Sequence, residues 1–204
     1  MIKKLSMLCM PLFLMSCNII SYSQVIPLIK TATFGVDDLK IDQEFIDNKE
    51  FSFIKVNVGR SAVAILSLAL IEDDVFVWVS SSGEKLKTVN GKIISSFGVN
   101  YNTNFINYSN FLLDHAQPTI NYSYDVMLTD PSAFIVQSAT LKKIKVDKTI
   151  VDKSSLYYEE VVHTADFKWN FTNKYWVSKN GLVSKSIQSI HPLQPRFTIE
   201  FYYK

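Results

Sequence analysis

The sequence predicts an all-β fold, either an antiparallel β-sandwich or a partly open β-barrel with one or two short helices. Apolar and polar residues alternate over several segments, among them 54–58, 167–172 and 197–201. Alternation with a period of two places apolar side chains on one face of a half-buried strand. Asn90-Gly91 and Asn180-Gly181 predict tight hairpins, because both central positions of a type I′ turn need positive φ. We expect roughly ten to twelve strands in one antiparallel assembly.

The N-terminal segment, residues 1–16, has the features of a cleavable signal peptide. Lys3 and Lys4 give it a positive start, and the apolar run 5–15 follows. That run is too short to cross a hydrocarbon core of about 30 Å as a helix, and no later run is long enough to do so. It suits the apolar region of an export signal.

Cys17 is the predicted site of lipid attachment. Leu14-Met15-Ser16-Cys17 resembles the lipobox of bacterial lipoprotein precursors. A thiol readily forms the diacylglyceryl thioether, and the small Ser16 gives a peptidase access to the bond before Cys17. We expect covalent diacylglycerol and an N-acyl chain on Cys17, and no other cofactor. The alternatives are an ordinary secretory signal with an incidental Cys17, or a buried N-terminal strand.

Residues 17–24 are interpreted as the lipidated cysteine and a tether, and residues 25–204 as a single β domain. Asn18 bears on sorting, because an Asp directly after the lipidated cysteine is the usual signal for retention in the inner membrane of enteric-type bacteria. Asn18 therefore favours delivery to the outer membrane, with the domain lipid-anchored at the periplasmic face. Stable anchoring needs more than one acyl chain, which a fully processed Cys17 provides.

Further strands are predicted along the rest of the chain. Residues 63–71 and 75–79 are almost continuously apolar and are interpreted as central strands, whereas residues 122–128 alternate. Helix is scarce. Residues 37–49 are expected to hold one short helix, and residues 104–115 a second helix or an irregular loop.

Two similar hexapeptides suggest a duplicated hairpin. Residues 78–83 and 176–181 share four of six residues, and each follows an apolar strand. A duplicated unit would suit two related sheets or half-barrels. Two similar turns that arose by chance are the alternative.

Charge and cysteine content exclude several classes of function. The full chain has a formal charge of +2, but removal of Lys3 and Lys4 leaves basic and acidic residues in equal number. No basic excess then remains to attract nucleic acid. Cys9 lies in the signal segment and Cys17 carries lipid, so the mature domain has no thiol for a disulfide, a metal site or a nucleophile.

No motif predicts catalysis or a metal site. His115, His163 and His191 are the only histidines, and no two have the short spacing of a helical or hairpin metal site. Glu159 and Glu160 are adjacent on a predicted strand, so they point to opposite faces and cannot act as a matched acid–base pair. No serine lies in a Gly-x-Ser-x-Gly turn. We therefore expect that the protein is not an enzyme.

Aromatic residues are the ambiguous feature of the sequence. Trp78 and Trp169 alternate with polar neighbours and are expected in the core. Where two aromatics are adjacent, one ring faces outward. Tyr158, Tyr175 and Tyr202 are the candidate contacts with a glycan or a protein partner, because exposed rings stack on sugars and dock proteins equally well.

Two blocks of residues carry a resemblance to a known family. The first contains Trp78-Val79-Ser80, Asn90-Gly91-Lys92-Ile93 and Gly98. The second contains Trp169-Asn170-Phe171, Tyr175-Trp176-Val177, Gly181, Val183, Lys185-Ser186-Ile187-Gln188 and Pro192. Together with residues 53–60 and the lipobox, these blocks are similar to the YjbF/GfcB family of outer-membrane lipoproteins, which is associated with exopolysaccharide and group 4 capsule production. The chain departs from the family at Ser95-Ser96-Phe97-Gly98, where the family has an Arg-Thr pair before the glycine.

The resemblance implies an all-β, non-catalytic accessory lipoprotein of exopolysaccharide or capsule assembly or export. It implies contact with an outer-membrane β-barrel and with periplasmic proteins of the same secretion system, with the polysaccharide as a further candidate partner. Two other functions stay open. A periplasmic glycan-binding module predicts a concave aromatic-lined groove, and a lipid-handling half-barrel predicts a large, purely apolar internal cavity. A hydrolase ranks last.

Overall fold

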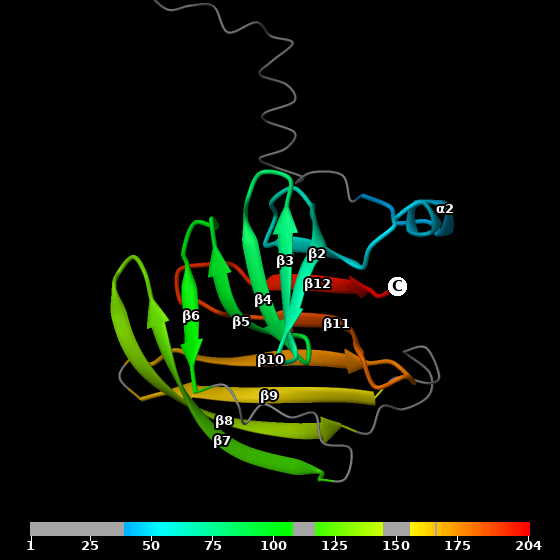
Figure 1. Cartoon of the computed structure of the whole chain (residues 1–204). Coiled ribbons are helices and arrows are strands. Elements are labelled where there is room, and N and C mark those ends of the chain that lie inside the picture. Colours follow the sequence, from blue (N-terminus) through cyan, green and yellow to red (C-terminus); the bar gives the residue numbers. More distant parts are fainter. Residues whose placement is uncertain (1–38, 108–116, 145–155, 166) are drawn as a thin grey trace, which may run out of the picture. The chain divides into compact units, whose positions relative to one another are not determined.

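The computed structural model describes residues 39–107, 117–144, 156–165 and 167–204. These residues form a closed antiparallel β-barrel, which confirms the predicted all-β class (Figure 1). One short helix and twelve strands lie in the described part of the chain. They are α2 (Gln43–Asp47), β1 (Phe53–Val58), β2 (Ala64–Glu72), β3 (Val75–Ser80), β4 (Lys85–Val89), β5 (Lys92–Phe97), β6 (Thr103–Ile106), β7 (Thr119–Leu128), β8 (Ala133–Ile144), β9 (Leu156–Thr164), β10 (Asn170–Val177), β11 (Val183–Gln188) and β12 (Phe197–Tyr202).

The barrel is closed by its first and last strands. Each strand pairs antiparallel with its neighbour in the chain, and β1 pairs with β12 from Phe53 opposite Tyr202 to Val58 opposite Phe197. In Figure 1, β2 to β6 run up and down, and β9 to β12 run across the picture behind them. The barrel lies within the compact unit of residues 37–204.

Apolar side chains that alternate along the strands fill the barrel. In β12, Phe197, Ile199 and Phe201 are buried, whereas the residues between them are partly exposed. Trp78 is fully buried on β3, as predicted. Trp169 lies just before β10 and is only partly buried where it packs against the core.

The two predicted tight turns differ in geometry. Asn90 and Gly91 join β4 to β5 with φ of 47° and 75°, which confirms the prediction for this hairpin. The turn between β10 and β11 is longer, since the Ser178 N–H donates to the carbonyl of Leu182 at 2.8 Å and only Gly181 has positive φ. The prediction of a two-residue turn there is therefore wrong.

A tight turn that was not predicted joins β2 to β3. Asp73 and Asp74 have φ of 47° and 66°, so two aspartates adopt the conformation that Asn-Gly adopts elsewhere. Aspartate tolerates the left-handed region better than most residues because its short side chain can hydrogen-bond locally.

The interpretation of residues 63–71 as a central strand is wrong for their second half. Leu70 and Ile71 are 52% and 54% exposed. The pairing of β2 with β1 ends at Ser67, and the register with β3 shifts between Leu68 and Leu70. The remainder of β2 therefore continues with β3 alone, without β1 beside it.

The helical expectations are corrected in length. α2 covers only part of the predicted segment 37–49, and its first turn is capped by Asp42, whose carboxylate accepts from the Phe45 N–H at 2.8 Å. The start of segment 104–115 belongs to strand β6, and residues 108–115 lie outside the described residues.

Candidate functional site

The predicted anchor lies outside the described residues. Cys17 and Asn18 both precede residue 39, so lipid attachment and sorting stay predictions. Among the described helices, none has the length and apolar character needed to cross a membrane.

The three tyrosines predicted as contact residues lie in different places. Tyr158 and Tyr175 are 1% and 0% exposed, which corrects the expectation that they reach a ligand on the surface. In each adjacent pair the other ring faces outward, and these rings belong to Tyr157 and Trp176. Tyr202 is partly exposed, so its contact with a glycan or a partner stays a prediction.

Outward-facing side chains of β9 to β12 and β1 form a continuous row across the sheet, which we call the outer row. The strand register places Tyr157 opposite Trp176, Trp176 opposite Lys185, Lys185 opposite Glu200 and Glu200 opposite Lys55. The rings of Tyr157 and Trp176 are 5.1 Å apart, and the ammonium of Lys185 lies 5.8 Å from the Trp176 ring. All five side chains are partly exposed.

Glu200 lies between two lysines at the charged end of the outer row. Its carboxylate lies 3.9 Å from the ammonium of Lys55 and 4.0 Å from that of Lys185. It also accepts a hydrogen bond from the Tyr202 hydroxyl at 2.9 Å. Burial of the ring, together with this carboxylate, raises the pKa of Tyr202 to about 12.

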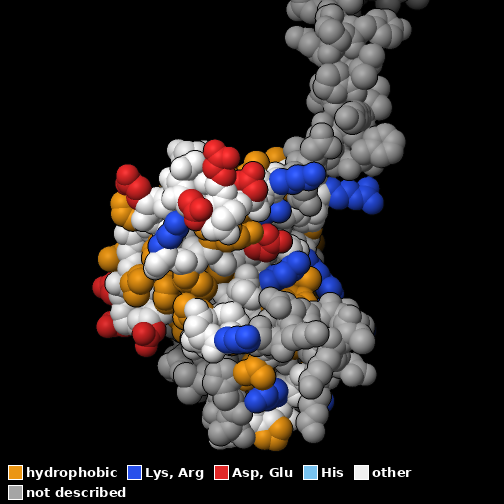
Figure 2. All heavy atoms as spheres, turned by 90° about the vertical axis from the view of Figure 1, so that its right-hand side faces the viewer, with side chains coloured by type: hydrophobic (Ala, Val, Ile, Leu, Met, Phe, Trp, Pro, Cys, Tyr) orange, Lys and Arg blue, Asp and Glu red, His pale blue; other side chains and the backbone are white. Residues whose placement is uncertain are grey.

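Glu159 has a similar position beside the aromatic end of the outer row. It accepts from the Tyr157 hydroxyl at 2.6 Å, and the Lys174 ammonium lies 3.9 Å away. Opposite charges therefore alternate across this part of the sheet. On the face that Figure 2 displays, basic and acidic side chains also lie close together, with hydrophobic side chains gathered among them.

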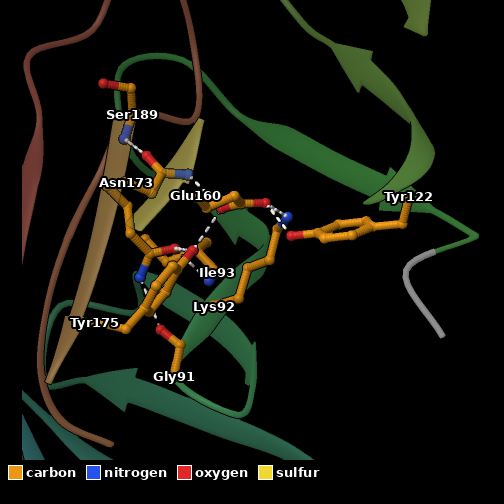
Figure 3. Close-up of polar contacts among 9 residues, drawn as sticks. Gly91, Lys92, Ile93, Tyr122, Glu160, Asn173, Tyr175 and Ser189 are labelled. Atoms are coloured by element: carbon orange, nitrogen blue, oxygen red, sulfur yellow. Dashed lines mark hydrogen bonds and ion pairs between the residues drawn. The ribbon is translucent and has the colours of Figure 1, made fainter. Parts of the chain in front are cut away.

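Inside the barrel, the carboxylate of Glu160 is the centre of a polar cluster (Figure 3). The side chain is 0% exposed and forms an ion pair with Lys92, which is 2% exposed. Tyr122 donates to Oε1 at 2.5 Å, and Asn173 and Tyr175 each donate to Oε2 at 2.8 Å. A carboxylate has about four acceptor positions, so the four donors account for all of them.

Aromatic rings surround the cation of this pair. The Lys92 ammonium lies 3.8 Å from the centroid of the Tyr124 ring and 5.3 Å from that of Tyr122, where ring electrons favour a positive charge. Burial lowers the pKa of Lys92, against the opposing effect of Glu160. Burial alone would raise the pKa of Glu160, but the charge of Lys92 and the donated hydrogen bonds outweigh it and hold that pKa below its usual value.

Hydrogen bonds to the backbone also hold the cluster in place. Gln188 donates to the carbonyl of Gly91 at 2.7 Å and accepts from the Ile93 N–H at 2.9 Å. The Oδ1 of Asn173 accepts from the Ser189 N–H at 2.9 Å. The side chains of the cluster come from β5, β7, β9, β10 and β11, so it ties five strands together across the interior, where it specifies one arrangement of the strands. Lys92 and Glu160 were not predicted as interior residues, although Glu160 stands at the inward phase of its strand.

A cavity of about 540 Å³, which we call the mouth cavity, lies at one end of the barrel. Its wall combines the buried Leu66, Leu86 and Phe197 with the turns after β1, β3 and β5. Arg60 and Glu84 also line it, so it is not the purely apolar internal cavity that a lipid-handling half-barrel predicts.

The histidines do not assemble a metal site in the described structure. No three His, Cys, Asp or Glu side chains come together there in a way that could hold a metal ion. His163 is exposed and contacts Asn170 at 3.2 Å. His191 is buried, and its Nδ1 accepts from the Leu193 N–H at 3.1 Å. His115 lies outside the described residues.

Comparison with known proteins places these features in context. The profile of a family described as "Group 4 capsule polysaccharide lipoprotein gfcB, YjbF" matches residues 28–201. Among solved structures, the hypothetical lipoprotein YmcC from Escherichia coli (K12) is similar, with a TM-score of 0.71 and 15% sequence identity over 90% of this chain and 96% of that chain. At this identity the similarity establishes a shared fold. No curated protein gives a significant match.

Proposed function

Because the chain belongs to the YjbF/GfcB family of group 4 capsule polysaccharide lipoproteins, we propose that it is a non-catalytic accessory factor in capsule or exopolysaccharide assembly or export. It acts by contact with an outer-membrane β-barrel and with periplasmic proteins of the same secretion system. The observation that carries this proposal is the outer row, in which aromatic and charged side chains share one outward face.

The composition of the outer row suits protein docking. Tyr and Trp are enriched at the centres of protein interfaces, because a rigid ring buries much area at little cost in conformational entropy. Tyr157 and Trp176 provide such rings side by side. The exposed charges of Lys185 and Glu200 beside them set orientation and discriminate between partners more than they add affinity.

The interior cluster supports a role without catalysis. All acceptor positions of Glu160 are taken by side chains of the protein itself. A general base needs a free position within hydrogen-bond reach of a substrate proton, and this carboxylate has none to offer.

Lipid on Cys17 would hold the domain at the periplasmic face of the outer membrane, with Asn18 permitting delivery there. The test is metabolic labelling with radioactive palmitate. We expect label on the wild-type chain and none on the Cys17→Ala variant. Persistent labelling of that variant would exclude Cys17 as the site.

The partner proposal is tested by complementation of a deletion strain. We expect deletion to reduce polysaccharide export, and the variant Tyr157→Ser/Trp176→Ser to restore neither export nor co-purification with an outer-membrane barrel of the same secretion system. Both substitutions are on partly exposed side chains, so the variant should fold and reach the membrane. Phe134→Ser is the matched control, since Phe134 is an exposed strand aromatic away from the outer row. Normal export after deletion would refute the proposal.

A periplasmic glycan-binding module is the second candidate function. The observation that favours it is the pair of outward rings of Tyr157 and Trp176, flanked by the hydrogen-bonding groups of Glu159 and Lys174. Flat rings stack on sugar faces while polar groups beside them bind hydroxyls. Titration with purified capsular polymer should then quench tryptophan fluorescence, and Trp176→Phe should remove most of that signal. An unchanged spectrum at saturating polymer would exclude this candidate.

A further inference from the structure

The mouth cavity is a site that the proposed function does not use. Its volume of about 540 Å³ falls in the range of roughly 300–1,000 Å³ that is typical of small-molecule sites. Val56, Leu66, Leu86 and Phe197 form its inner wall and are each at most 4% exposed, so the wall is continuous with the barrel core. We propose that the mouth cavity binds one acyl chain of a free fatty acid, with the carboxylate at Arg60.

The wall of the cavity selects for a hydrocarbon chain. Its inner part carries side chains without polar atoms, so a chain entering it leaves water without breaking hydrogen bonds. Each methylene that becomes buried strengthens binding by about fourfold. Ala62 and Ala64 line the same cavity with methyl groups only, and they leave space that a larger residue would fill.

Arg60 provides the complementary charge. It lines the cavity, is exposed, and forms no ion pair among the residues that the structure describes. A guanidinium donates two parallel hydrogen bonds to a carboxylate, which suits the head group of a fatty acid. The one carboxylate in the lining, Glu84, is occupied by hydrogen bonds from the hydroxyls of Ser80 and Ser82.

The test is photoaffinity labelling of the purified full chain in one fixed detergent. The probes are palmitate and hexadecanol that each carry a diazirine in the chain, and adducts are located by mass spectrometry. We expect both probes to label the cavity wall, with palmitate about tenfold the stronger, because a charge-assisted contact is worth about one decade. Arg60→Gln should reduce palmitate labelling to the level of hexadecanol and leave hexadecanol unchanged.

A filling variant tests the position of the site. Ala64→Trp should abolish labelling by both probes, whereas Ala165→Trp, on an exposed alanine after β9, should leave both unchanged. Thermal unfolding of each variant shows whether it is folded. If Ala64→Trp does not fold, the comparison of the two probes on Arg60→Gln decides the proposal. Wild-type labelling in a folded Ala64→Trp chain, or equal labelling by palmitate and hexadecanol, would overturn the proposal. So would cavity labelling that appears only in a Cys17→Ser chain, because the chain's own lipid would then be the occupant.

Discussion

Glu159 and Glu160 are neighbours in β9 and each pairs with a lysine, yet their ion pairs differ in almost every physical respect. Glu159 faces outward, is 32% exposed and lies 3.9 Å from Lys174. Glu160 faces inward, is 0% exposed and pairs with Lys92, which is 2% exposed. Water screens the outer pair, so its contribution to stability is about 0–1 kcal/mol. The inner pair has lost its water and depends on protein donors for every acceptor position.

The difference separates residues that hold the fold from residues that are free to serve recognition. A buried ion pair is tolerated only when its geometry and its further hydrogen bonds are complete, so the partners of Glu160 constrain one another. The charges beside the outer row carry no such constraint. Variants on each side of this division should therefore differ in stability, and the largest difference is expected for the buried carboxylate.

Removal of the buried carboxylate should have the largest effect. Glu160→Ala leaves the ammonium of Lys92 buried without its anion, and we expect the free energy of unfolding to fall by about 3–5 kcal/mol. Glu159→Ala is the matched control, with an expected loss below about 1 kcal/mol. Urea unfolding followed by tryptophan fluorescence measures both. Equal losses in the two variants would remove the distinction between the pairs.

Removal of both charges should recover part of that loss. The double variant Lys92→Met/Glu160→Leu leaves no uncompensated charge, so we expect it to be more stable than either single variant. The coupling between the two sites should be about 1–3 kcal/mol, in the upper part of the range for residues in contact. Strict additivity in the double-mutant cycle would argue against a mutually dependent pair.

The two tyrosine hydroxyls give a smaller contrast of the same kind. Tyr175 donates to the buried Glu160, and Tyr157 donates to the exposed Glu159. Tyr175→Phe should cost about 1.5–3 kcal/mol, the value for a hydrogen bond to a charged group, whereas Tyr157→Phe leaves a carboxylate that water can solvate and should cost under about 1 kcal/mol. Calorimetric unfolding at neutral pH compares them. A larger effect at Tyr157 would contradict the assignment of inside and outside.

The pH dependence should be the most gradual effect. The pKa of Glu160 in the folded state is below its ordinary value of 4.5, so its contribution is present above that value and is lost as pH falls through the folded pKa. One such group changes the free energy of unfolding by at most about 1.4 kcal/mol per pH unit. Wild type should therefore lose stability more steeply below pH 4.5 than Glu160→Gln does. Parallel curves would mean that Glu160 is not ionised in the fold.

The all-β class could be predicted from alternation, but barrel closure could not. Alternation reports which residues of one strand share a face. The pairing of Phe53 with Tyr202 is a contact between the two ends of the domain, and no local pattern encodes it. The sandwich and the open barrel were therefore equally compatible with the sequence.

The facing of the aromatic pairs could not be predicted either, because both faces of these strands carry large residues. Tyr157 and Tyr158 satisfy either phase of the alternation, as do Tyr175 and Trp176. The inward phase of β9 also carries Glu160. A glutamate is expected on the exposed face unless the four donors that bind its carboxylate are known. Those donors come from three other strands, so the signal is not local.

The two similar hexapeptides share a turn but differ in which way their tryptophans face. Both form turns in which the glycine N–H donates to a serine carbonyl, Gly83 to Ser80 at 3.2 Å and Gly181 to Ser178 at 3.0 Å. Their tryptophans differ, since Trp78 is buried in the barrel and Trp176 lies in the outer row. The shared residues therefore encode a common turn, while the orientation of each strand is set by its neighbours.

Because β1 pairs with β12, closure of the whole barrel depends on the six residues of the last strand. A chain that stops before Phe197 would leave the backbone groups of β1 and β11 as two open edges, which invite aggregation and proteolysis. The contacts that complete the fold are also the most distant in sequence, so they form at the greatest entropic cost. A truncated chain therefore carries open strand edges that proteases can attack, whether or not a partner protein is present.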